Sequence, residues 1–264
     1  MRRASASAKI NLALVVGPVR ADGLHEVATV LQRVDLSDRI ELEPADENRV
    51  SGFDGDTLVA RALDLASEET GEHWRARIEK RIPVAAGLGG GSSDAATALA
   101  LAGGKRLTRE RLHELAAQLG SDAPFFLADG PQLATGAGTD LEALELPQDY
   151  WIVLVLPHGV RKPSTAAVYE SFAAADGFEQ RRTALTDALA AVRRPSDLAA
   201  LPPNDLARSP AADKLRDAGA FRADVSGAGP TVYGLFVRER DARDAADRMR
   251  SVGQVWLTAP AWYG

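Results

Sequence analysis

The chain has 264 residues, of which 45% are hydrophobic and 26% charged, and its formal net charge is −6. This composition is ordinary for a soluble globular protein of one large or two modest domains, and the acidic balance gives no basic face for nucleic acid. No cysteine is present and the four histidines lie far apart, which excludes disulfides and thiolate metal sites and argues against a histidine-rich zinc site.

The first half of the chain predicts strands and helices in turn. Residues 8–16 form an apolar run that Lys9 and Asn11 interrupt, which favours a buried strand over a signal peptide. Residues 21–27 predict a turn and an exposed loop. Further strands are expected over residues 39–44 and 76–84, and helices over residues 58–70, 92–102 and 109–119.

The pattern restarts after Pro147–Tyr150 with a central strand over residues 151–157. Its apolar run is too short to span a bilayer, so we predict no membrane partner and a cytoplasmic location. Two arginine-rich helices, a strand–turn–strand over residues 222–237, a helix over 238–251 and a strand over 254–259 follow. We predict two domains, residues 1–149 and 150–264.

The segment PVAAGLGGGSSDAA, residues 83–96, places a glycine run and two serines directly before a helix. It fits neither the Walker phosphate loop, because no lysine follows, nor the G-x-G-x-x-G dinucleotide pattern. Glycine backbone amides and a helix N-terminus nevertheless favour an anion, and serine hydroxyls bind phosphate or Mg²⁺. From the residues alone, phosphate binding and a glycine-rich turn with a serine cap both stay open.

The order of motifs along the chain narrows the choice. PVAAGLGGGSSDAA resembles the phosphate loop of the GHMP kinases. The doubled GLGGGSSDAA resembles the branch that phosphorylates 4-diphosphocytidyl-2-C-methyl-D-erythritol, an intermediate of the non-mevalonate isoprenoid pathway. AKINLAL, ADGLHEV, GSDAPFF, LPHGVRKPSTAAVY, PPNDL and SGAGPTVYG are similar to other segments of that branch, in the same order.

This resemblance implies an α/β (α+β) fold of two domains with substrate in the cleft between them. The N-terminal domain would be a nucleotide-binding domain similar to ribosomal protein S5, and the C-terminal domain would be ferredoxin-like. ATP with Mg²⁺ would be the cofactor, while the metal ligands and the oligomeric state are not predicted. The implied nucleotide-binding residues are Pro83, Val84, Ala85, Ala86, Gly87, Leu88, Gly89, Gly90, Gly91, Ser92 and Ser93.

Lys9 and Asp122 match the catalytic pair of the resembled family. An ammonium group would stabilise the transferring phosphoryl group, and a carboxylate would accept the proton of the attacking hydroxyl. From the residues alone, the alternative for Lys9 is a strand-end lysine reaching solvent, and the alternative for Asp122 is a helix cap. Asn11 shares a strand face with Lys9 and would bind substrate or orient Lys9, unless it is an ordinary edge polar residue.

The substrate residues implied by the resemblance are His25, Thr165 and Tyr169, with the cytosine of a cytidine-diphosphate sugar alcohol between aromatic walls. The family's tyrosine before the histidine is Leu24 here, which removes a π-face worth about 1–3 kcal/mol per stacked base. Thr57 stands where the family has asparagine. A kinase for another small alcohol such as homoserine, or a nucleotide-binding protein without catalysis, stays as an alternative.

Overall fold

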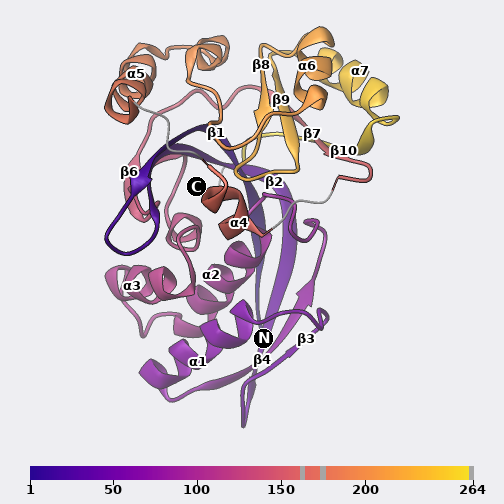
Figure 1. The fold of residues 1–264 in the computed structure, drawn as a ribbon. Coiled ribbons are helices and arrows are strands. Elements are labelled where there is room, and N and C mark those ends of the chain that lie inside the picture. Colours follow the sequence, from indigo (N-terminus) through magenta and orange to yellow (C-terminus); the bar gives the residue numbers. More distant parts are fainter. Residues whose placement is uncertain (161–163, 173–176, 262–264) are drawn as a thin grey trace. The chain divides into compact units, whose positions relative to one another are not determined.

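The computed structural model describes residues 1–160, 164–172 and 177–261 (Figure 1). Residues 161–163, in the segment LPHGVRKPSTAAVY, therefore lie outside the described part. The strands are β1 (Arg2–Val19), β2 (His25–Ala45), β3 (Arg49–Ser51), β4 (His73–Glu79), β5 (Gln132–Gly136), β6 (Asp140–Ala143), β7 (Trp151–Pro157), β8 (Arg222–Val225), β9 (Val232–Phe236) and β10 (Gly253–Thr258). The helices are α1 (Leu58–Thr70), α2 (Gly90–Gly103), α3 (Arg109–Leu119), α4 (Thr165–Glu170), α5 (Phe178–Ala191), α6 (Pro210–Asp217) and α7 (Glu239–Met249), with short 3-10 helices η1 (Pro124–Leu127) and η2 (Pro195–Ala200).

The chain forms two compact units that interleave along the sequence. The first contains Met1–Ala8, Leu36–Val84 and Gly89–Asp129, and the second contains Lys9–Asp35, Ala85–Leu88 and Gly130–Gly264. Strands β1 and β2, which pair with each other, contribute residues to both units. The sequence division into residues 1–149 and 150–264 stays a prediction.

In the first unit, helices α1, α2 and α3 pack against one another, as the lower part of Figure 1 shows. Strand β4 pairs antiparallel with the second part of β2 and parallel with β3, and α1 and α2 contact β4. Helix α2 is rich in alanine and buries most of its residues, which lets its neighbours approach its backbone closely. The start of this tightly held helix is where the glycine run ends.

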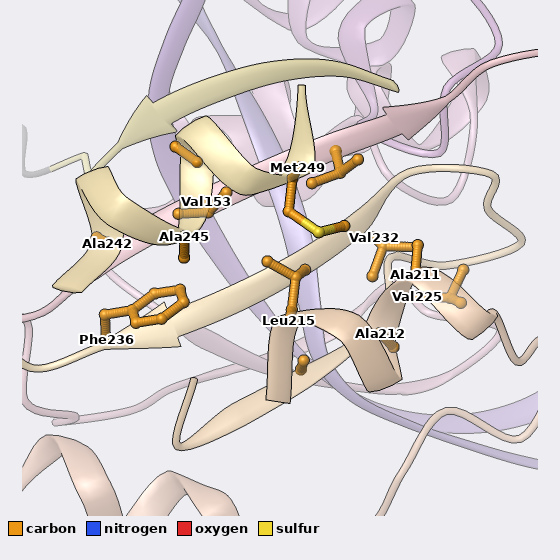
Figure 2. Packing of buried hydrophobic residues seen from close by; sticks show 13 residues of the cluster. Val153, Ala211, Ala212, Leu215, Val225, Val232, Phe236, Ala242, Ala245 and Met249 are labelled. Atoms are coloured by element: carbon orange, nitrogen blue, oxygen red, sulfur yellow. The ribbon is translucent and has the colours of Figure 1, made fainter. Parts of the chain in front are cut away.

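In the second unit, β10, β7, β9 and β8 form an antiparallel sheet in that order. Helices α6 and α7 pack on this sheet. Figure 2 shows side chains of both helices meeting those of the strands, with Leu215, Val232 and Met249 near the centre. The sheet places the turn between β8 and β9, residues 226–231, at a fixed position beside β1.

Most predicted elements are present, but several of their bounds differ from those expected. The strand expected over residues 76–84 ends at Glu79, because the carboxylate of Asp38 accepts hydrogen bonds from the backbone amides of Arg81 and Ile82. Those amides are therefore not available to a neighbouring strand. The loop expected over 21–27 is shorter, since β2 begins at His25. Within the described ranges, no helix has the length and apolar character needed to cross a membrane.

Candidate active site

The first turn of α2 follows the glycine run; it is accessible to solvent, but neighbouring side chains leave little room for a Cβ at Gly90. Gly89 precedes the helix with a left-handed φ of 70°, and the amide of Ser93 donates to the Gly89 carbonyl at 2.9 Å. A Cβ on Gly90 would lie 3.0 Å from the side chain of Ile82, so a larger residue would displace the loop. The amides of residues 90–92 have no acceptor inside the helix, which is the arrangement that binds anions at helix N-termini.

The two serines of the run differ in exposure. Ser92 is half-buried, whereas Ser93 is only 1% exposed. The Ser93 hydroxyl has no hydrogen-bond partner among the described residues, although buried hydroxyls usually have one. Ser93 directly follows residues 90–92, so its unpartnered hydroxyl and their amides suit a site that a polar ligand completes.

A buried ion cluster, Asp38, Lys80 and Asp94, lies beneath this loop. The Lys80 Nζ is 2.5 Å from Asp38 Oδ2 and 2.8 Å from Asp94 Oδ2. Burial raises the pKa of Asp94 to about 7, and the negative charge of Asp38 adds to the effect. The cluster joins the end of β4 to the first turn of α2, and so fixes both sides of the glycine loop.

In the second unit, the preceding part of the glycine loop, residues 85–88, is held by backbone hydrogen bonds. The Lys9 amide donates to Leu88 O at 2.9 Å, and the Thr231 amide donates to Ala86 O at 3.1 Å. The Ser226 hydroxyl donates to Gly87 O at 2.9 Å. The 226–231 turn and β1 therefore both fix this part of the loop.

Lys9 and Asn11 lie together on one face of β1, as the alternation of side chains predicts. Both are 4% exposed, and the Lys9 ammonium donates to Asn11 Oδ1 at 2.8 Å. The Asn11 amide donates in turn to the Thr29 hydroxyl oxygen at 2.8 Å. A Cβ on Gly227 would lie 3.1 Å from Asn11 Oδ1 and 3.7 Å from Lys9 Nζ, so the 226–231 turn contacts this pair.

His25 stands beside two aromatic rings. Its ring centroid is 5.6 Å from that of Tyr169 and 6.1 Å from that of Phe172. The His25 Nδ1 is 2.8 Å from Gly17 O, and because a carbonyl only accepts, Nδ1 carries the proton and donates. Leu24, the residue before His25, is 49% exposed.

Several of the predicted residues lie together within the second unit. Lys9 contacts both Asn11 and Leu88 of the loop, and the rings of His25 and Tyr169 are neighbours. Thr165 is the exposed first residue of α4, one turn before Tyr169. The remaining predicted residues, Pro83, Val84, Gly89, Gly90, Gly91, Ser92, Ser93 and Asp122, belong to the first unit.

Asp122 is half-buried in the turn between α3 and η1. Pro124 occupies the first position of η1, as expected for a residue that lacks an amide proton. The Ala123 amide donates to Gly120 O at 3.1 Å, which closes the turn that carries Asp122. The backbone on both sides of this carboxylate is therefore constrained.

Sequence reasoning missed the residues that support these side chains. Thr29 is a single polar residue in the apolar run VATVL, a weak signal of a buried hydrogen bond. Asn204 lies in the segment PPNDL, where nothing marks it out, yet its amide donates to Val225 O and Gly227 O and holds the 226–231 turn. In the described part of the chain, no cluster of three His, Asp or Glu side chains forms a candidate metal site.

Comparison with known proteins supplies the family. The model of the GHMP kinases N terminal domain matches residues 57–130, and that of the GHMP kinases C terminal domain matches residues 209–255. A protein of Pelotomaculum thermopropionicum named 4-diphosphocytidyl-2-C-methyl-D-erythritol kinase is 40% identical over 94% of this chain and 93% of its own length.

Two solved structures extend the comparison. A crystal structure of 4-(cytidine 5'-diphospho)-2C-methyl-D-erythritol kinase has a TM-score of 0.79 and 32% identity, covering 98% of this chain and 100% of that one. Homoserine kinase from Cytophaga hutchinsonii has a TM-score of 0.72 at 17% identity, covering 96% and 94%, and shares the fold. These matches confirm the predicted fold class, with its N- and C-terminal kinase domains.

Proposed function

Since this chain belongs to the GHMP kinases, in the 4-diphosphocytidyl-2-C-methyl-D-erythritol kinase family, we propose that it phosphorylates the 2-hydroxyl of that alcohol with ATP. The main support for this proposal is the 40% identity to a kinase of that name over 94% of the chain. The reaction would belong to the non-mevalonate isoprenoid pathway. Both proposed substrates are charged, water-soluble molecules, and we propose a cytoplasmic location.

We assign the nucleotide phosphates to the loop of residues 83–93. The unpaired amides at the start of α2 and the left-handed Gly87 and Gly89 support this role, because such a backbone admits an anion without side-chain clashes. Mg²⁺ prefers hard oxygen ligands, and the Ser93 hydroxyl, which lacks a partner among the described residues, is one such group. When bound, the metal ion would neutralise charge on the phosphates.

We assign the chemistry to Lys9 and Asp122. Phosphoryl transfer passes through a loose transition state, so the protein contributes mainly position and charge. The Lys9 ammonium would stabilise negative charge on the transferring group, and its hydrogen bond to Asn11 supports a fixed position. The Asp122 carboxylate would accept the proton of the attacking hydroxyl; such a late transfer needs only a weak base.

We assign the cytosine to His25 and Tyr169, with Leu24 as an apolar wall and Thr165 nearby. The ring of His25 donates from Nδ1 to Gly17 O, and in the tautomer that this selects Nε2 is the acceptor. An acceptor there matches the exocyclic amine of cytosine. The ring of Tyr169 supplies a stacking face that Leu24 lacks.

A coupled assay of ADP release tests the proposal. The purified protein is offered ATP–Mg²⁺ with 4-diphosphocytidyl-2-C-methyl-D-erythritol or with homoserine, and we expect turnover with the first alone. Turnover with homoserine alone would refute the substrate assignment. ATP binding with no turnover of either alcohol would favour the non-catalytic alternative.

Replacement of Asp122 separates catalysis from binding. We expect Asp122→Asn to lower kcat by about 100-fold or more while the Kd for ATP stays near the wild-type value, because a general base contributes about that much. The isosteric amide keeps the shape of the turn. A wild-type kcat would remove Asp122 from the mechanism.

A further inference from the structure

Thr29 is a buried residue of β2, and we propose that it is a positioning residue for Lys9, acting through the side-chain amide of Asn11. The three side chains are 5%, 4% and 4% exposed respectively. The effect on catalysis rests on the proposed function, whereas the positioning of Lys9 does not.

The three side chains form a hydrogen-bonded chain whose direction is fixed at one end. The Thr29 hydroxyl donates to Ala13 O at 2.7 Å, and a backbone carbonyl can only accept. The hydroxyl has a single proton, so its oxygen must act as acceptor toward Asn11 Nδ2, 2.8 Å away. The Asn11 amide therefore turns its oxygen toward Lys9 Nζ, also at 2.8 Å.

This direction matters because the two ends of an asparagine amide are nearly identical in shape and opposite in chemistry. An ammonium group has three donors and no acceptor. If the Asn11 amide turned over, its NH₂ group would face the Lys9 ammonium, donor against donor. Thr29 is the group that makes the productive orientation favourable, since its oxygen can satisfy only the NH₂ end.

The 226–231 turn limits the other ways in which the pair could rearrange. The position of a Cβ on Gly227 is only 3.1 Å from Asn11 Oδ1. Asn204 holds this turn through hydrogen bonds to Val225 O at 2.9 Å and Gly227 O at 2.7 Å. With the turn fixed, rotation of the amide in place is the main alternative, and Thr29 opposes it.

Kinetics of Thr29 variants give the first test. Thr29→Val keeps the side-chain shape but removes the hydroxyl, and we expect kcat to fall at least about tenfold while KM for ATP changes less than about twofold. Thr29→Ser restores the hydroxyl and should recover most of kcat. Thr258→Val, at a site 6% exposed in β10, is the matched control for a buried Thr→Val change and should keep wild-type kcat. A wild-type kcat in Thr29→Val overturns the proposal.

Nitrogen NMR of the lysine ammonium groups tests the positioning without any substrate. Lys9 is one of five lysines, and its ¹⁵Nζ signal is identified by its loss in Lys9→Arg. We expect this signal to shift or broaden in Thr29→Val, to stay in place in Thr29→Ser, and the signals of the other lysines to be unchanged. An unchanged Lys9 signal in Thr29→Val refutes the inference. If Thr29→Val does not fold, Thr29→Ala is judged by the same criteria.

The kinetic and NMR tests together distinguish a failure of the proposed function from a failure of the positioning inference. A wild-type protein without kinase turnover, together with the expected NMR result, contradicts the proposed function and leaves the positioning of Lys9 intact. Full turnover of wild type and of Thr29→Val, with an unchanged signal, contradicts the positioning alone.

Discussion

Substitution of Gly87 by alanine probes how closely the glycine loop approaches the turn at residues 226–231. Gly87 has a φ of 81°, which is unfavourable for any residue with a Cβ. A Cβ there would also lie 2.6 Å from Ser226 O and 2.7 Å from Gly229 O, whereas ordinary contact begins near 3.4 Å. Both neighbours are backbone atoms, so the loop or the turn must move.

Gly23→Ala is the matched control. Gly23 has the same φ of 81°, but a Cβ there has no heavy atom within 4 Å. Gly23→Ala should therefore lose only about 1 kcal/mol of stability, because alanine is unfavourable at this left-handed φ. Gly87→Ala should lose that amount and an overpacking cost of about 1–3 kcal/mol, for a total of about 2–4 kcal/mol.

Urea denaturation with linear extrapolation measures both free energies of unfolding. We expect Gly87→Ala to be the less stable variant by about 1–3 kcal/mol and to show a raised KM for ATP. Equal losses in the two variants would mean that the loop yields at no cost, and would refute the close approach deduced from the structure.

Three further changes have distinct outcomes. The pKa of Asp94 is 3.8 in the unfolded chain and about 7 in the folded protein. Between these two values the folded protein holds a proton on Asp94 that the unfolded chain has already released. Stability should therefore fall as pH rises through this window, by at most about 1.4 kcal/mol per pH unit, and Asp94→Asn should remove that part of the slope in urea titrations at several pH values. Tyr233→Phe removes a buried hydroxyl that donates to Leu12 O and accepts from Arg222 Nε, and calorimetry should show a loss of about 1–3 kcal/mol. His25→Ala should raise KM for the cytidine substrate more than KM for ATP in steady-state assays, and equal effects would place His25 elsewhere.

Local patterns predicted the elements whose ends are set by local chemistry. The bounds expected for α1 and β7 agree with the structure, and the Thr108 hydroxyl caps α3 by accepting from the Arg111 amide. The strand expected over residues 76–84 failed at its end, where the side chain of Asp38, distant in sequence, takes the backbone amides. A pattern of alternating apolar residues does not contain that partner.

In the candidate site too, sequence patterns predicted some residues and missed others. The glycine run, Lys9 and Asn11 were predicted because a motif or strand periodicity marks them. Thr29 and Asn204 were missed because their importance lies in which groups they contact across the fold. Single polar residues in apolar or proline-rich segments give no indication of such partners.

If His25 binds the base as we propose, its hydrogen bond to Gly17 O determines which pyrimidine the ring can recognise. With Nδ1 committed to a carbonyl, neutral Nε2 accepts, and a uracil carbonyl in place of the cytosine amine would meet lone pair against lone pair. On this proposal, the uridine form of the substrate should have a higher KM than the cytidine form.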